Sequence, residues 1–113
     1  MSNSDRQMHL AVFAQGLGAA QSVWRSPRTE PEKVHTLGHW TKVAQVAEEG
    51  LLDAVFIADA LNLSTSIGTD DTERPDPIVV LSALAAVTSR IGLVGTSSTT
   101  YNAPFGVARQ FAT

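Results

Sequence analysis

The chain has 113 residues, a formal net charge of −3 and no cysteine. The negative charge gives no electrostatic reason to expect a nucleic-acid partner, and the lack of cysteine excludes disulfides and thiolate metal sites. Hydrophobic residues make up 43% of the chain and charged residues 17%, a composition typical of one globular domain. No apolar run is long enough to span a bilayer, and the first residues, MSNSDRQMH, lack the apolar core of a signal peptide. We therefore expect a cytoplasmic protein without a membrane partner.

The first half of the chain predicts a strand, a long connection and a helix. Residues 9–14 (HLAVFA) form a short apolar run typical of a strand. Residues 15–36 are largely polar, and a connection of this length in a compact domain is often functional. Residues 37–49 then place apolar side chains on one face of a predicted helix, and Gly50 follows at the position of a C-terminal cap. The residues of that face are Leu37, Trp40, Val43, Ala44 and Ala47.

A second unit of the same kind follows. Residues 52–58 (LDAVFIA) are apolar enough for a strand that is buried on both faces. Asp76 and Pro77 predict the start of a helix, because the Asp side chain accepts hydrogen bonds from free amides and Pro suits the first turn. We expect this helix over residues 78–88. Its inward side chains are predicted to be Leu81, Leu84, Ala85 and either Val87 or Thr88.

The third unit completes an alternating order. Residues 91–95 predict a strand, and residues 105–113 predict a helix whose apolar stripe contains Val107, Ala108 and Phe111. The order β-α-β-α-β-α implies an α/β fold with a parallel sheet. A (β/α)₈ barrel needs eight such units and about 250 residues. We therefore interpret residues 1–113 as the N-terminal portion of a single larger domain, truncated after three βα units.

Two of the predicted strands are followed at once by polar groups. Asp59 comes directly after residues 52–58, and residues 96–100 (TSSTT) come directly after residues 91–95. Ligands of parallel α/β folds bind at the carboxyl ends of the strands, which favours a ligand site formed by these groups. Two alternatives stay open. Asp59 could bond the amides of its own loop, and the hydroxyl run could belong to an ordinary solvated loop.

Other motifs give weaker signals. Residues 16–21 (GLGAAQ) lack the third small residue and the following helix of a dinucleotide-binding loop. His35 and His39 have a spacing that can hold a metal, but no third ligand is evident, so we predict no metal site. Trp24 and Arg25 lie in the first long loop, where they could cover a flat ligand and hold an anionic group. A hydrophobic plug beside a solvated Arg is the alternative interpretation of that pair.

Four stretches of the chain resemble one family. They are MHLAVFAQG (residues 8–16), the Trp24-Arg25 pair, AEEGLLDAVFIAD (residues 47–59) and all of residues 76–113. Together they resemble the beginning of a flavin-dependent monooxygenase of the bacterial-luciferase-like superfamily, in the branch of nitrilotriacetate, EDTA and dibenzothiophene-sulfone monooxygenases. The resemblance is most specific from residue 76 onward, where Phe105 stands at a position that is usually Tyr in the family.

The resemblance implies a TIM-barrel enzyme that binds reduced FMN at the strand carboxyl ends and uses O₂ to oxygenate a small organic substrate. A separate NAD(P)H:FMN reductase would supply the flavin. Asp59 matches the family's flavin-contacting acid, and one or both of Ser98 and Thr99 match its flavin-contacting hydroxyl position. Trp24 and Arg25 are the candidate substrate contacts, and no catalytic residue is assigned.

The number of predicted units limits what this chain does by itself. Three βα units leave two sheet edges unpaired, which favours a homo-oligomer and predicts no activity without a complete barrel. Two alternatives remain beside the monooxygenase. One is a non-catalytic chain that self-associates, and the other is a small-molecule-binding α/β module.

Overall fold

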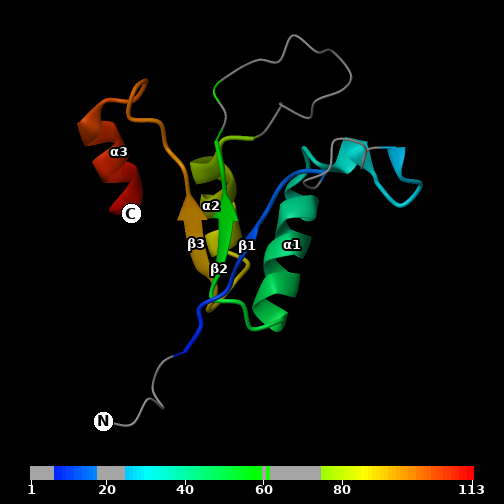
Figure 1. Ribbon diagram of the computed structural model, residues 1–113. Helices are drawn as coiled ribbons and strands as arrows, with labels where there is room; N and C mark the ends of the chain where they lie inside the picture. The colour runs from blue at the N-terminus through cyan, green and yellow to red at the C-terminus, as the bar shows by residue number, and fades with distance from the viewer. Residues whose placement is uncertain (1–6, 18–24, 60, 62–74) are drawn as a thin grey trace, which may run out of the picture.

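Three parallel strands form the centre of the molecule (Figure 1). The computed structural model describes residues 7–17, 25–59, 61 and 75–113. The elements in chain order are β1 (Ala11–Phe13), a short 3-10 helix (Pro31–Lys33), α1 (Leu37–Glu49), β2 (Ala54–Ile57), α2 (Pro77–Ala85), β3 (Gly92–Gly95) and α3 (Pro104–Phe111). The predicted alternation of strands and helices is confirmed.

The strands pair side by side in the order β1-β2-β3. Phe13 of β1 pairs with Phe56 of β2, which in turn pairs with Val94 of β3. Both pairings are parallel, so the chain must return to the same end of the sheet between strands, and α1 and α2 lie in these connections. The carboxyl ends of all three strands therefore meet at one edge of the sheet, and the fold class is α/β as expected.

Helices α1 and α2 both begin at a capping side chain. Thr36 precedes α1, and its Oγ1 accepts a hydrogen bond from the His39 N–H at 3.4 Å. The Asp76 Oδ1 accepts one from the Val79 N–H at 3.0 Å at the start of α2, which confirms the start predicted there. Over the described residues, none of the helices combines the length and apolar character that a membrane span requires.

The core lies between the sheet and two helices on one of its faces. Helices α1 and α2 lie on the same side of the strands (Figure 1). Val55 and Ile57 of β2 point to that side and are 1% exposed, and Ala44 of α1 and Leu84 of α2 are fully buried against them. Burial of apolar surface at about 25 cal/mol per Å² is the main force that holds these layers together.

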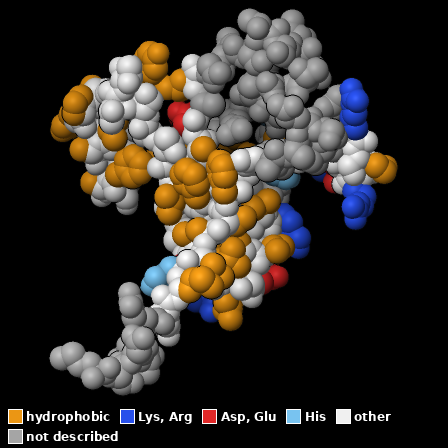
Figure 2. Space-filling model, in the orientation of Figure 1, with side chains coloured by type: hydrophobic (Ala, Val, Ile, Leu, Met, Phe, Trp, Pro, Cys, Tyr) orange, Lys and Arg blue, Asp and Glu red, His pale blue; other side chains and the backbone are white. Residues whose placement is uncertain are grey.

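None of the described helices covers the opposite face of the sheet. The rings of Phe13 and Phe56 are in contact there, with centroids 5.1 Å apart. Phe13 remains 48% exposed and Val94 46% exposed. Figure 2 shows hydrophobic side chains gathered over the strands on this face. The prediction that β2 is buried on both faces is therefore wrong for the described chain, because both packed helices lie on the same side.

Several details of the helices differ from the prediction. Helix α2 ends at Ala85 rather than Thr88, because the Val87 N–H and the Thr88 hydroxyl both bond the Leu84 carbonyl and end the regular pattern. Leu37 is 50% exposed, since it stands at the first position of α1, beyond the edge of the core. Ala85, which was predicted to point inward, is exposed. Helix α3 covers Pro104–Phe111 instead of residues 105–113, and none of its side chains is buried.

Asp53 joins the first two strands at their amino ends. Its Oδ2 accepts a hydrogen bond from the Leu10 N–H at 2.7 Å, and its Oδ1 lies 3.2 Å from the His9 Nδ1. These contacts, the Leu10 amide first and His9 second, lower the pKa of the Asp53 carboxyl. Asp53 therefore links the segment before β2 to the segment before β1 at the edge opposite the carboxyl ends.

Candidate functional site

The carboxyl edge of the sheet consists of the residues that directly follow the three strands: 14–17, 58–59 and 96–100. Backbone pairing continues into this edge. The Ala14 N–H donates to the Phe56 carbonyl at 2.9 Å, and the Thr96 N–H donates to the Ile57 carbonyl at 3.2 Å. The residues after each strand are therefore held beside one another before the chain diverges into loops.

Asp59 lies two residues beyond β2 and is partly buried. Within the described parts of the chain, no hydrogen bond or ion pair engages its carboxylate. Most of the loop whose amides it was expected to bond in the alternative interpretation, residues 60 and 62–74, lies outside the described residues. A partly buried carboxylate in this position can accept a hydrogen bond from a ligand N–H.

The hydroxyl run divides into two parts. Thr96, Ser97 and Ser98 continue the direction of β3 and are partly buried, whereas Thr99 and Thr100 are exposed in a turn. The side-chain amide of Asn102 donates to the Ser98 carbonyl at 2.8 Å and fixes the backbone at the point where the turn begins. Ser98 is therefore the last residue of the run before the chain turns away, and Thr99 lies beyond it.

The candidate substrate contacts are only partly covered by the structure. Trp24 lies outside the described residues, and Arg25 is exposed at the start of the segment that leads to α1. Arg25 makes an interaction of its own in the chain. The position of the Trp24-Arg25 pair relative to Asp59 and the hydroxyl run therefore stays a prediction.

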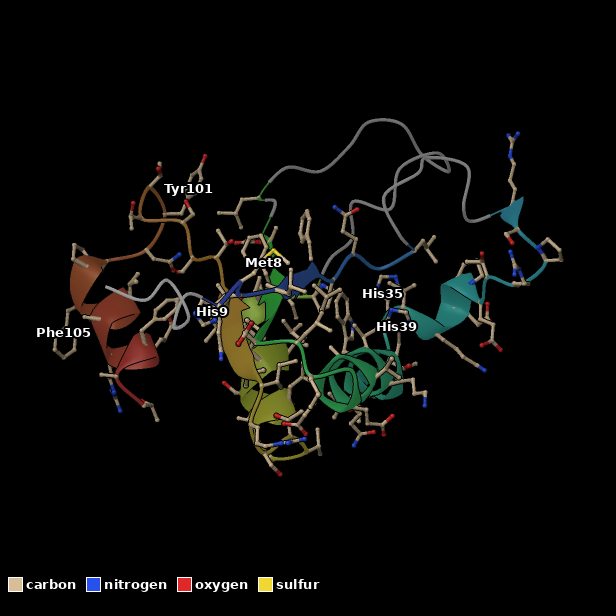
Figure 3. All side chains as sticks on the ribbon, turned by 60° about the horizontal axis from the view of Figure 1, so that its bottom comes forward. Met8, His9, His35, His39, Tyr101 and Phe105 are labelled. Carbon is tan, nitrogen blue, oxygen red and sulfur yellow. The ribbon has the colours of Figure 1, made fainter. Side chains whose placement is uncertain are left out.

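The histidines do not form a metal site in the described chain. His9 bonds Asp53 at the amino ends of the strands, whereas His35 and His39 lie at the entry to α1 (Figure 3). Over the described residues, no group of three potential ligands comes together. The side chains of Tyr101, in the turn before α3, and Phe105, in the first turn of α3, are exposed.

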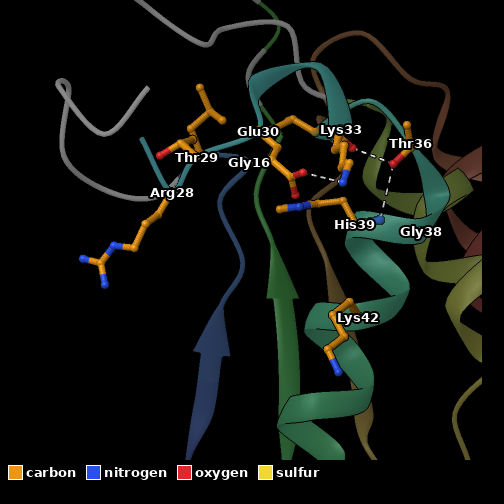
Figure 4. Close-up of a pocket in the computed structure, with 11 residues that line it drawn as sticks. Gly16, Arg28, Thr29, Glu30, Lys33, Thr36, Gly38, His39 and Lys42 are labelled. Atoms are coloured by element: carbon orange, nitrogen blue, oxygen red, sulfur yellow. Dashed lines mark hydrogen bonds and ion pairs between the residues drawn. The ribbon is translucent and has the colours of Figure 1, made fainter. Parts of the chain in front are cut away.

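One hollow of about 500 Å³ lies at the same end of the molecule, between residues 16–17, residues 28–30 and the start of α1 (Figure 4). Glu30 and Lys33 form an ion pair with Oε1 and Nζ 2.5 Å apart, and the hydrogen bond to Glu30 raises the pKa of Lys33. Four of the chain's eight basic side chains fall between residues 25 and 42. This density of basic residues is the sequence signal for the hollow, which none of the motifs above predicts.

The comparisons with known proteins identify the family. Residues 8–113 match the family model described as luciferase-like monooxygenase. The chain belongs to this family. It is 41% identical to N-acetyl-S-(2-succino)cysteine monooxygenase of Bacillus subtilis (strain 168), over 99% of this chain and 25% of that protein. Nitrilotriacetate monooxygenase component A of Aminobacter aminovorans is 31% identical over 96% of this chain and 27% of its own length.

Solved structures give the same result for the fold. EDTA monooxygenase from Chelativorans sp. BNC1 superimposes with a TM-score of 0.87 at 29% identity, over 95% of this chain and 25% of that chain. Riboflavin lyase, solved with modified FMN and riboflavin, superimposes with a TM-score of 0.77 at 32% identity, over 95% of this chain and 26% of its own. The resemblance inferred from the sequence motifs is confirmed. The luciferase-like monooxygenase chain described here spans about a quarter of the length of these relatives.

Proposed function

We propose that this chain contributes part of the flavin site of an FMN-dependent monooxygenase that acts in the cytoplasm. The main support is the position of three side chains. Asp59 follows β2, and Ser98 and Thr99 follow the neighbouring strand β3 at the same edge of the sheet. The chain that carries them belongs to the luciferase-like monooxygenase family. Ligands of parallel α/β folds bind at this edge. The riboflavin lyase structure with modified FMN supports a flavin as the ligand.

The donors and acceptors present fit such a ligand. A flavin offers ring N–H and C=O groups and a hydroxylated side chain, and its chemistry with O₂ comes from the flavin itself. The Asp59 carboxylate accepts from an N–H, while a Ser or Thr hydroxyl both donates and accepts. In this proposal Asp59 orients the ring and Ser98 or Thr99 bonds the ring edge or the side chain. The residues of this chain therefore bind and position the cofactor.

The partners follow from the relatives. The nitrilotriacetate enzyme is named component A, which indicates that it works with a second protein component. We propose that the corresponding partner of this chain is an NAD(P)H:FMN reductase that delivers the reduced flavin. The substrate is a small organic molecule, with Trp24 and Arg25 as its candidate contacts. In this account residues 1–113 form the N-terminal portion of one luciferase-like TIM-barrel domain, and oxygenation requires the complete barrel.

Anaerobic calorimetry with reduced FMN tests the proposal on three proteins: the unmodified chain, Asp59→Asn and Glu49→Gln. Asp59→Asn removes a charge of the site, whereas Glu49→Gln removes the same charge from an exposed position on α1. We expect Asp59→Asn to weaken the binding of reduced FMN about tenfold, the value of one charge-assisted hydrogen bond. Glu49→Gln should bind like the unmodified chain. Equal affinities in all three proteins would contradict the role of Asp59.

The open sheet face favours a second candidate, self-association without catalysis. Phe13 and Val94 are each nearly half exposed on that face, and a large exposed apolar surface is typical of an interaction site. Size-exclusion chromatography over a range of protein concentrations, without flavin, distinguishes the two candidates. An elution volume that shifts with concentration, in a chain that binds no flavin, would favour self-association over the flavin site.

A further inference from the structure

The carboxyl edge also contains Gln15, which lies two residues beyond β1 and was not among the predicted site residues. Its side chain is partly buried, and the described residues offer its amide no hydrogen-bond partner. A carboxamide has an oxygen that accepts and an NH₂ group that donates. Since buried polar groups are normally hydrogen-bonded, a partly buried carboxamide that bonds nothing in the chain is available to a ligand.

Gln15 points to the sheet face that α1 and α2 do not cover. Ala14 is buried in the core beneath the helices, and Gly16 lines the hollow before α1, so Gln15 between them points the opposite way. The same alternation applies to β2. Ile57 is buried against the helices, and Ala58, the next residue, therefore lies on the same face as Gln15.

Thr96 has this orientation too, after β3. A Cβ built at the preceding Gly95 would stand 2.7 Å from the Leu81 Cδ1 of α2, so Gly95 faces the helices and Thr96 faces away from them. The strand register, continued two residues past its last row common to all three strands, places Ala58 between Gln15 and Thr96. We call Gln15, Ala58 and Thr96 the edge row.

The edge row is polar at both ends, small in the middle and uncharged. Neighbouring strands lie about 4.8 Å apart, so Gln15 and Thr96 flank the methyl group of Ala58 at a separation of roughly 10 Å. This arrangement leaves room for a flat group. Asp59 is the only charged residue of the carboxyl edge, which contains no basic residue. A phosphate therefore finds no cation among these residues, whereas a neutral hydrogen-bonding group finds suitable partners.

We propose that Gln15 contacts the flavin, with its side-chain amide paired to the polar edge of the ring, where an N–H lies between two carbonyl groups. The Gln15 NH₂ donates to a ring carbonyl, and its oxygen accepts from that N–H. The reduced ring carries a further N–H, which leaves a donor for Asp59. The proposal rests on the proposed function and extends it, because it assigns the neutral ring, and not the phosphate, to this edge of the sheet.

Anaerobic calorimetry with reduced FMN tests the contact in two variants of the 113-residue chain. Gln15→Leu keeps the approximate size of the side chain and removes both hydrogen bonds, so we expect about tenfold weaker binding. Gln110→Leu makes the same change at an exposed position on α3 and should bind like the unmodified chain. Far-ultraviolet circular dichroism confirms that each variant is folded. Normal binding by Gln15→Leu, or an equal loss in Gln110→Leu, would overturn the contact.

Two flavin analogues test which part of the cofactor Gln15 contacts. Reduced 3-methyl-FMN has a methyl group in place of the hydrogen on the nitrogen between the two carbonyls, so Gln15→Leu should bind it about as tightly as the unmodified chain does. Reduced riboflavin lacks the phosphate, and Gln15→Leu should weaken its binding by the same factor as for FMN. A full loss with 3-methyl-FMN, or no loss with riboflavin, would overturn a contact with the ring edge.

Asp59→Asn separates a failure of this contact from a failure of the flavin site. Weak binding of reduced FMN by Asp59→Asn, together with normal binding by Gln15→Leu, would overturn the Gln15 contact and leave the flavin site in place. If the unmodified chain binds no reduced FMN, the flavin site is wrong and the Gln15 contact is wrong with it.

Discussion

Glu48 accepts a hydrogen bond from the backbone N–H of Ile91 at 3.0 Å, and this contact joins the end of α1 to the start of β3. The same oxygen, Oε1, also accepts from the amides of Ser89, at 2.8 Å, and Arg90, at 2.5 Å. These three amides, Arg90 first, lower the pKa of the Glu48 carboxyl. One side chain thus fixes the loop that positions the strand bearing the hydroxyl run.

This contact predicts a pH dependence of stability. The pKa of Glu48 in the folded chain lies below its ordinary value of 4.5, so its stabilisation is complete above that pH and is lost as the pH falls through the folded value. Urea denaturation of Glu48→Gln should therefore show a smaller loss of stability than the unmodified chain between about pH 6 and pH 3. Glu49→Gln, without amide contacts among the described residues, is the control. An identical pH dependence in Glu48→Gln and the unmodified chain would contradict the amide contact as the cause.

Gly92 lies so close to its neighbour strand that a side chain does not fit. A Cβ built there would stand 2.9 Å from the Asp53 carbonyl oxygen, a backbone atom, whereas one at Gly106 on α3 would meet nothing within 4 Å. Gly92→Ala should lower the free energy of unfolding by about 1–3 kcal/mol. Gly106→Ala should raise it by up to about 1 kcal/mol through helix propensity. Chemical denaturation of both variants checks the pair, and equal effects would show that the approach of β3 to Asp53 is looser than described.

Leu51 has a positive φ of 60°, although the preceding Gly50 was the residue expected to end α1. Gly50 is indeed the C-cap, with φ −74°, and the left-handed conformation falls one residue later. That conformation costs a side-chain-bearing residue about 1–2 kcal/mol. Leu51→Gly should raise the free energy of unfolding by about 0.5–1 kcal/mol, because the relief of this strain exceeds the extra backbone entropy that Gly loses on folding. Leu51→Ala keeps the cost and should give no gain; a gain from Ala equal to that from Gly would exclude strain as the reason.

Trp40 connects α1 to the segment before it. Its indole N–H donates to the Val34 carbonyl at 2.8 Å, and both residues are buried. Trp40→Phe leaves that carbonyl without a partner and should lower the free energy of unfolding by about 1–3 kcal/mol. Denaturant titration measures this loss. Unchanged stability would mean that another donor replaces the indole.

Local sequence signals were sufficient for the order of the elements. The apolar runs gave the three strands, and Asp76 with Pro77 marked the start of α2, because strand burial and helix capping depend on residues close together in the chain. The early end of α2 was missed, since it depends on the Thr88 hydroxyl bonding the Leu84 carbonyl. Helix propensity does not predict where a side-chain hydroxyl will compete with a backbone N–H for a carbonyl.

Contacts between distant residues could not be predicted in the same way. The Glu48 contact with Ile91 joins residues 43 positions apart, and nothing in either neighbourhood indicates it. Asp59 and the hydroxyl run were placed at one edge correctly, because parallel strands bring their carboxyl ends together. The sequence did not indicate which of the hydroxyls stays at that edge. This depends on the turn after Ser98, which the Asn102 side chain fixes.

The central claim is that reduced flavin binds at the carboxyl edge of this sheet, and amide chemical shifts test it most directly. Anaerobic titration of the ¹⁵N-labelled chain with reduced FMN should shift the amide signals of Asp59, Ser98 and Thr99. The signals of Asp53 and Gly92, at the opposite edge, should stay unchanged. Shifts confined to the opposite edge or to the open face around Phe13, or no shifts at saturating flavin, would contradict the proposed flavin site.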